Sequence, residues 1–372
     1  MVRVIRNITI SQTTKTIFRW GIVLASIALL GLPMIISAAI VPYVNSSLVA
    51  QYQVGNIQGQ ITFNQAGKAP EVLDISIWYP TTGQGSFSFE GFDGTLADFS
   101  GGPYPLIIFN HGLNANDIDP LYLKESLVGQ GYVVASVEFN DMPSIIFSDY
   151  ISTTPRTDWD NRTDNLFSAV DNFFRDNYLN YLENYRINQS RFSLDYVLNM
   201  NENPSSPFYG LIDADKIGMA GHSLGGLTTL SLSGAHPDPA VADPRIKAII
   251  LLATPAYPFE NNLDNVNIPV MVMRGDYDLM MTSAEDDLWV TDQGLSAPKF
   301  FLVVSQSHHF TFSQSPYSIS DPLPHVNHDG RIEVIMIYSL AFMNYYLKGD
   351  ADALKVLENQ DPMLAQYYYE LE

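Results

Sequence analysis

The stretch Asp215-Lys-Ile-Gly-Met-Ala-Gly-His-Ser-Leu-Gly-Gly226 joins a short apolar run to the chain's single G-x-S-x-G motif. The pattern predicts a strand over 216–220 and a helix over 225–233, so Ser223 lies at a strand-to-helix turn. Such a turn is tight and needs small residues on both sides of the serine, here Gly221 and Gly225. A serine held in this way exposes its hydroxyl at the end of the sheet. Ser223 is therefore predicted to be a nucleophile; the alternative is a glycine-rich turn with an incidental serine.

Buried apolar runs alternate with helical patterns on both sides of this motif. Strands are predicted at 72–80, 106–109, 132–138, 246–252, 270–273 and 300–304, and helices at 121–129, 164–178, 332–347 and 351–357. Short, continuous apolar runs are typical of parallel strands buried on both faces. The alternation predicts an α/β fold with a mainly parallel central sheet flanked by helices.

A serine hydroxyl is a weak nucleophile and needs a base that is itself oriented by a carboxylate. In a fold with this turn the acid and the base follow the serine in that order. The strand at 270–273 is followed by Arg274-Gly-Asp-Tyr-Asp278, and the strand at 300–304 by Ser305-Gln-Ser-His-His-Phe310. Both loops leave the carboxyl ends of strands, where α/β sheets bind ligands.

Each of these loops offers two candidates. Asp278 is preferred to Asp276 as the acid, because it stands three residues after Gly275. His309 is preferred to His308 as the base, because the apolar residues that follow it can pack beneath the loop. The second member of each pair stays an alternative.

An acyl-transfer site also needs donors for the oxyanion. One is expected to be the N–H of Leu224, the residue after the nucleophile. The other is expected in the loop Asn110-His-Gly-Leu113 after an early strand, where Gly112 lets the backbone approach a substrate. The N–H of Leu113 is the predicted second donor.

Composition excludes several classes of protein. The 372 residues contain no cysteine, which excludes disulfides, thiolate metal sites and a cysteine nucleophile. The formal net charge is −21, and a chain this acidic repels a phosphate backbone, so nucleic acid is not an expected partner. Neither a cofactor nor a metal is implied by the motifs.

The N-terminal segment predicts export. Residues 1–19 hold four basic residues and no acidic one, and residues 20–44 are uncharged. This length suits a single transmembrane anchor with a cytoplasmic N-terminus, which leaves the domain at 45–372 outside the cytoplasm. The alternative is a cleaved signal peptide and a secreted protein, with Ser37 and Ala39 at a small-x-small cleavage site.

At these motifs the chain resembles the α/β-hydrolase superfamily, within the branch of platelet-activating-factor acetylhydrolases, dienelactone hydrolases and polyester hydrolases. The resemblance covers roughly 70–350. It rests on Ile77-Trp-Tyr-Pro80, Pro105-Leu-Ile-Ile-Phe-Asn-His-Gly-Leu113, Gly131-Tyr-Val-Val-Ala-Ser-Val-Glu138, the 215–226 stretch, Ile268-Pro-Val-Met-Val-Met-Arg-Gly275, His309-Phe-Thr-Phe312 and Ala341-Phe-Met-Asn-Tyr-Tyr-Leu-Lys-Gly349. It implies an α/β-hydrolase fold and a Ser223–His309–Asp278 triad.

Two departures limit what the resemblance implies. In the acetylhydrolases the acid follows the strand after the serine helix, but here that strand runs into Ala253-Thr-Pro-Ala256 without a carboxylate. Acetylhydrolase specificity is therefore not carried over. The second departure is an insertion at about 141–207. It is expected either to form a lid over the cleft or to be an aromatic-rich surface excursion packed on its own core.

Together these observations predict a serine hydrolase that cleaves a small-molecule or lipid-like carboxylic ester through an acyl-enzyme. The alternatives are a membrane-tethered binding protein that keeps the fold without turnover, or a peptidase or acyltransferase that uses the same triad.

Overall fold

A nine-stranded sheet runs through the part of the chain that the structure describes. This computed structural model describes residues 49–113, 115–139, 178–259, 261–278, 294–296, 298–313 and 330–372. The strand order is β1-β2-β6-β5-β7-β8-β9-β10-β11. The bounds are β1 (Gln53–Phe63), β2 (Glu71–Thr81), β5 (Tyr104–Asn110), β6 (Val133–Val137), β7 (Ile212–His222), β8 (Ile246–Leu252), β9 (Val270–Gly275), β10 (Lys299–Val304) and β11 (Leu364–Glu370).

The middle of the sheet is parallel. All neighbouring pairs from β6 to β10 run parallel, whereas β1 and β2 at one edge and β11 at the other are antiparallel to their neighbours. Every residue of β5, β9 and β10 is buried, as expected for strands covered on both faces. The predicted α/β fold with a mainly parallel sheet is confirmed.

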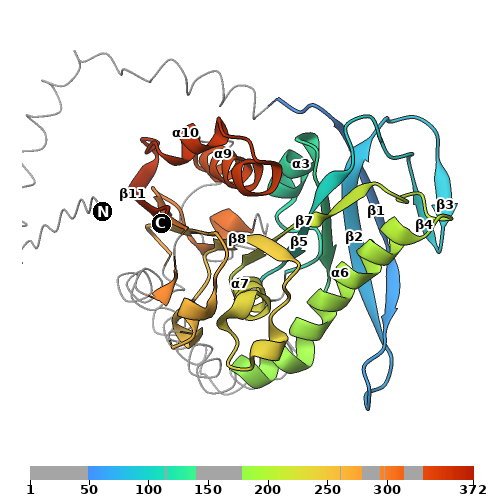
Figure 1. Cartoon of the computed structure of the whole chain (residues 1–372), viewed down its shortest axis with the longest axis horizontal. Coiled ribbons are helices and arrows are strands. Elements are labelled where there is room, and N and C mark those ends of the chain that lie inside the picture. The colour runs from blue at the N-terminus through green and yellow to red at the C-terminus, as the bar shows by residue number, and fades with distance from the viewer. Residues whose placement is uncertain are drawn as a thin grey trace, which may run out of the picture. The chain divides into compact units, whose positions relative to one another are not determined.

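Helices cover both faces of this sheet (Figure 1). One face carries α3 (Leu121–Gly129), α9 (Gly330–Met343) and α10 (Ala353–Leu357), and the other carries α6 (Ile187–Glu202) and α7 (Leu224–Leu230). Successive residues of β5 point to opposite faces. Leu106 and Ile108 join the core beneath α6 and α7, and Ile107 and Phe109 join the core beneath α3 and α9.

The described part of the predicted insertion, residues 178–207, is not a lid or a separate excursion. Most of it is helical, and α6 contacts β5, β6 and β7 directly. Its residues Ile187, Leu194, Val197 and Met200 are buried in the same core as the sheet. Residues 140–177, the rest of that insertion, lie outside the described residues.

Smaller differences concern the edges of the sheet. The edge strands β1 and β11 had no predicted counterpart. The same holds for the hairpin of β3 (Phe87–Phe89) and β4 (Phe92–Gly94). The helix predicted at 332–347 is α9 followed by a π-helical turn, Asn344–Lys348.

The predicted basic segment at 1–19 and the anchor at 20–44 lie outside the described residues and stay predictions. Within the described ranges, no helix combines the length and the apolar character needed to cross a membrane.

The packing of α6 predicts the effect of a truncation in its buried face. Leu194→Ala should lower the free energy of unfolding by about 2–5 kcal/mol, because it opens a cavity between α6 and the sheet. Denaturant unfolding measures the change. The matched control is Asn199→Ala at an exposed position of the same helix, which should stay within about 0.5 kcal/mol of the parent. If Leu194→Ala lowered the free energy of unfolding by no more than the control does, α6 would not be part of the cooperative core.

Candidate active site

Ser223 occupies a strained turn between β7 and α7. Its backbone angles are φ 53° and ψ −121°, a conformation that a residue with a side chain rarely adopts. Two backbone bonds hold the turn: the N–H of Ser223 donates to the carbonyl of Leu252 at 2.9 Å, and the N–H of Gly226 donates to the carbonyl of Ser223 at 2.9 Å. The turn is thus fixed to the end of β8 on one side and to its own helix on the other.

The glycines around this serine have no room for a side chain. A Cβ at Gly225 would lie 2.0 Å from the carbonyl oxygen of Asn110, and one at Gly221 would lie 2.3 Å from the carbonyl oxygen of Gly225. A Cβ at Gly226 would lie 1.8 Å from Oγ1 of Thr254. The serine turn therefore packs directly against the end of β5, backbone on backbone.

The predicted base and acid are paired. His309 begins the short 3-10 helix His309–Phe312, and its Nδ1 lies 3.0 Å from Oδ2 and 3.2 Å from Oδ1 of Asp278. Both side chains are buried, with 5% and 3% of their surface exposed. A carboxylate on Nδ1 fixes the tautomer in which Nε2 carries the lone pair.

The two competing residues hold the loops instead. Asp276 is exposed, and its Oδ1 accepts a bond from the N–H of Ser307 at 3.1 Å, which ties the acid loop to the histidine loop. His308 caps the 3-10 helix, since its Nδ1 accepts from the N–H of Phe310 and its N–H donates to Oγ1 of Thr311. Each of them thus makes a bond that shapes its loop, whereas the buried carboxylate–imidazole pair is formed by Asp278 and His309.

The loop after β5 lies against the serine turn. A Cβ at Gly112 would approach the Cβ of Ser223 to 3.5 Å and Nδ1 of His222 to 2.8 Å. Leu224 is the first residue of α7, and the first N–H groups of a helix have no partner within that helix. The two predicted oxyanion donors, Leu113 and Leu224, therefore belong to segments that meet at Ser223.

His111 in the same loop is buried and holds the loop together. Its Nε2 accepts from the N–H of Phe139 at 3.0 Å, so the ring proton is on Nδ1, which lies 2.7 Å from the carbonyl oxygen of Gly112. The imidazole thus bridges the ends of β5 and β6.

His222 is another buried histidine, and sequence reasoning did not single it out. Its Nε2 lies 3.1 Å from the carbonyl oxygen of His309, and the two rings are 4.8 Å apart. Burial first, and then the neighbouring His309, hold the pKa of His222 well below its usual value, so the ring is neutral and donates from Nε2. The only sequence signal was its place next to the serine. This hydrogen bond ties the His309 loop to the serine turn.

A buried lysine, Lys124, bonds the part of the loop after β5 that leads into α3. Nζ of Lys124 donates to the carbonyl of Asp117 and lies 4.6 Å from the ring centre of Trp78, while the carboxylate of Asp117 accepts from the hydroxyl of Ser76. Desolvation lowers the pKa of Lys124 to about 7, against the opposing effect of Asp117.

Comparison with known proteins finds a family to which part of the chain is similar. Residues 179–350 match the family described as PETase, PET hydrolase-like, so the expected resemblance to the polyester hydrolases is confirmed there. The family is one of ester hydrolases of the α/β-hydrolase type, and the match implies this class of reaction. No curated protein matches the chain significantly.

The buried ammonium of Lys124 predicts a pH-dependent stability. Its pKa is about 7 in the folded chain and about 10.5 in the unfolded chain, so the unfolded chain binds more protons at this position between these values. Stability must then rise with pH in that window. The free energy of unfolding of the parent minus that of Lys124→Met should increase by about 2 kcal/mol from pH 7 to pH 9.

Denaturant unfolding at both pH values measures this difference. The contributions of other titrating groups cancel, because the parent and the variant share them. The matched control is Lys247→Met, which removes a lysine from an exposed position without emptying a buried site. A difference for Lys124→Met that stays constant or falls with pH would contradict the assignment of a buried, readily deprotonated amine.

Proposed function

We propose that this chain is a serine hydrolase that cleaves a carboxylic ester through an acyl-enzyme, a reaction supported by the match of residues 179–350 to the PET hydrolase-like family. Ser223 is the nucleophile, His309 the general base and Asp278 the residue that orients the base. The observation that carries the proposal is the buried pair of His309 Nδ1 and the carboxylate of Asp278, 3.0 Å apart.

The pairing supports a base rather than a structural histidine. An imidazole whose Nδ1–H is bound by a carboxylate keeps Nε2 as an acceptor for the proton of a hydroxyl, and the carboxylate stabilises the imidazolium that forms. Burial of both groups excludes water and strengthens that stabilisation. Ser223 directly follows His222 in the chain, and His222 bonds the carbonyl of His309. This bond supports a location of the His309 ring beside Ser223.

The proposed reaction has two halves. The hydroxyl oxygen of Ser223 attacks the acyl carbon while Nε2 of His309 takes its proton, and the carbonyl oxygen becomes an oxyanion. The ester bond then breaks, and the imidazolium returns the proton to the leaving alcohol. Water, deprotonated by the same histidine, attacks the acyl-enzyme and releases the acid.

The oxyanion needs preorganised donors. The proposal assigns this role to the N–H groups of Leu113 and Leu224, which lie on the two segments that meet at the serine. Donors fixed by the fold cost no reorganisation when charge develops, which makes them the largest single contribution in many acyl transfers.

Removing the nucleophile tests the proposal. Ser223→Ala should lower turnover of p-nitrophenyl acetate and butyrate by about 10⁶-fold, since the three groups act as a unit, and should leave thermal unfolding close to that of the parent. Ser233→Ala is the matched control, because Ser233 lies just beyond α7 and its hydroxyl donates to the carbonyl of Thr229, one turn earlier. Residual activity of Ser223→Ala within tenfold of the parent would refute the assignment.

Four alanine variants test the choice within each catalytic loop. Asp278→Ala should lower turnover by about 10⁴-fold, because the base loses its correct tautomer, and His309→Ala should lower it at least as much. Asp276→Ala and His308→Ala each remove one bond that shapes a loop and should cost less than their neighbours. Steady-state kinetics on one ester decide the matter. A greater loss from Asp276→Ala or His308→Ala would reverse that half of the assignment.

A further inference from the structure

A fully buried arginine grips the loop that carries the proposed oxyanion donor. Arg186 stands directly before α6, and none of its surface is exposed. Its Nη1 donates to the carbonyl oxygen of His111 at 2.7 Å, and its Nη2 donates to the carbonyl oxygen of Gly112 at 3.2 Å. The guanidinium carbon lies 4.4 Å from the ring centre of Phe139. Two consecutive carbonyls of the loop thus bind one rigid, planar cation.

The direction of these carbonyls determines the direction of the neighbouring N–H groups. A trans peptide is planar, and its C=O and N–H point in opposite directions. The carbonyl of Gly112 and the N–H of Leu113 belong to the same peptide. Because Arg186 and Nδ1 of His111 both hold that carbonyl, the N–H of Leu113 must point away from the arginine.

The charge of the arginine adds a second effect. Charge-assisted bonds are stronger than neutral ones, and a chain of bonds polarises its members. A cation on the oxygen of the Gly112–Leu113 peptide withdraws electron density from it and makes its N–H a better donor.

We propose that Arg186 is a positioning residue that orients and polarises the Gly112–Leu113 peptide, so that the N–H of Leu113 stabilises the oxyanion of the transition state. The inference rests on the proposed ester hydrolysis at Ser223. It differs from a purely structural role, in which the guanidinium would only fill the space beside Phe139 and tie α6 to the sheet.

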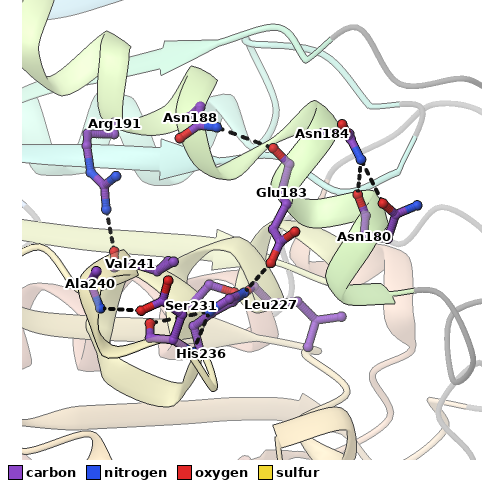
Figure 2. A network of polar contacts seen from close by, with 11 residues as sticks. Asn180, Glu183, Asn184, Asn188, Arg191, Leu227, Ser231, His236, Ala240 and Val241 are labelled. Atoms are coloured by element: carbon purple, nitrogen blue, oxygen red, sulfur yellow. Dashed lines mark hydrogen bonds and ion pairs between the residues drawn. The ribbon is translucent and has the colours of Figure 1, made fainter. Parts of the chain in front are cut away.

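The test compares Arg186→Met with a control variant at Arg191, which lies in the helix that Arg186 precedes. Arg191 in α6 also donates to a backbone carbonyl, that of Val241, in a network that links α6 to the residues after α7 (Figure 2). The same network holds Glu183 and His236, whose Oε1 and Nε2 are 3.2 Å apart. Nε of Arg191 also lies 3.6 Å from Oδ2 of Asp243, and the side chain is 28% exposed. Arg191→Met therefore removes a long cation from a structural contact that lies outside the proposed site.

Two quantities separate positioning from packing. The first is kcat and KM for a p-nitrophenyl ester, and the second is the inhibition constant of an alkyl trifluoromethyl ketone, whose adduct with serine carries an oxyanion. For Arg186→Met we expect kcat to fall about 10²–10³-fold, as for loss of one oxyanion donor, with KM within threefold of the parent. The inhibition constant should rise in proportion to the loss in kcat/KM, because a transition-state analogue depends on the same donors. Arg191→Met should change both quantities less than twofold.

Several outcomes would overturn the inference. One is a folded Arg186→Met with kcat and the inhibition constant within threefold of the parent; another is a fall in kcat without weaker binding of the ketone. Should Arg186→Met fail to fold, Arg186→Lys is judged by the same criteria, since it keeps the charge but cannot hold both carbonyls as a planar fork. A parent protein that neither hydrolyses esters nor binds the ketone would overturn the proposed function itself.

Discussion

The serine turn and the end of β5 touch backbone to backbone, and the site is built around that contact. At Gly225 a single added carbon would lie 2.0 Å from the carbonyl oxygen of Asn110. This approach brings the proposed nucleophile and the loop with the proposed oxyanion donor into one rigid unit before any substrate arrives. It also explains why Ser223 can keep a strained backbone, since the residues on both sides of it have no freedom to relax.

Buried polar groups surround this contact in an otherwise apolar core. The hydroxyl of Ser190 donates to the side chain of Asn110, which donates to the hydroxyl of Thr229, so α6, β5 and the serine helix share one chain of bonds. Arg186 and His222 add their own bonds to the loops on either side. Most of the bonds that these groups make reach backbone or side-chain atoms of distant segments. Burying such polar groups costs little only if the fold holds every partner in place. These buried polar bonds therefore hold the loops at the carboxyl ends of the strands, where α/β folds bind their ligands.

The features of the fold and the site that have a local sequence pattern could be predicted from the sequence. The apolar strands and the glycine-flanked serine are local, and the spacing after Gly275 and before Phe310 led to the two residues that the structure pairs, Asp278 and His309. Sequence reasoning missed α6, because that segment is rich in Asn and Ser, residues that weaken a helical pattern unless tertiary bonds hold them. The bonds from Arg186 to the loop after β5 could not be predicted from the sequence. The partners of Arg186 lie 75 and 74 residues away, and nothing near it distinguishes a buried arginine from an exposed one.

The central claim is that Ser223 is an activated nucleophile, and covalent labelling tests it most directly. The folded protein would be treated with a fluorophosphonate, and the modified residue identified by intact mass and peptide mapping, with the heat-unfolded protein as control. The account predicts one adduct, on the hydroxyl of Ser223, that forms only in the folded protein. The absence of an adduct, or an adduct on another residue, would contradict it.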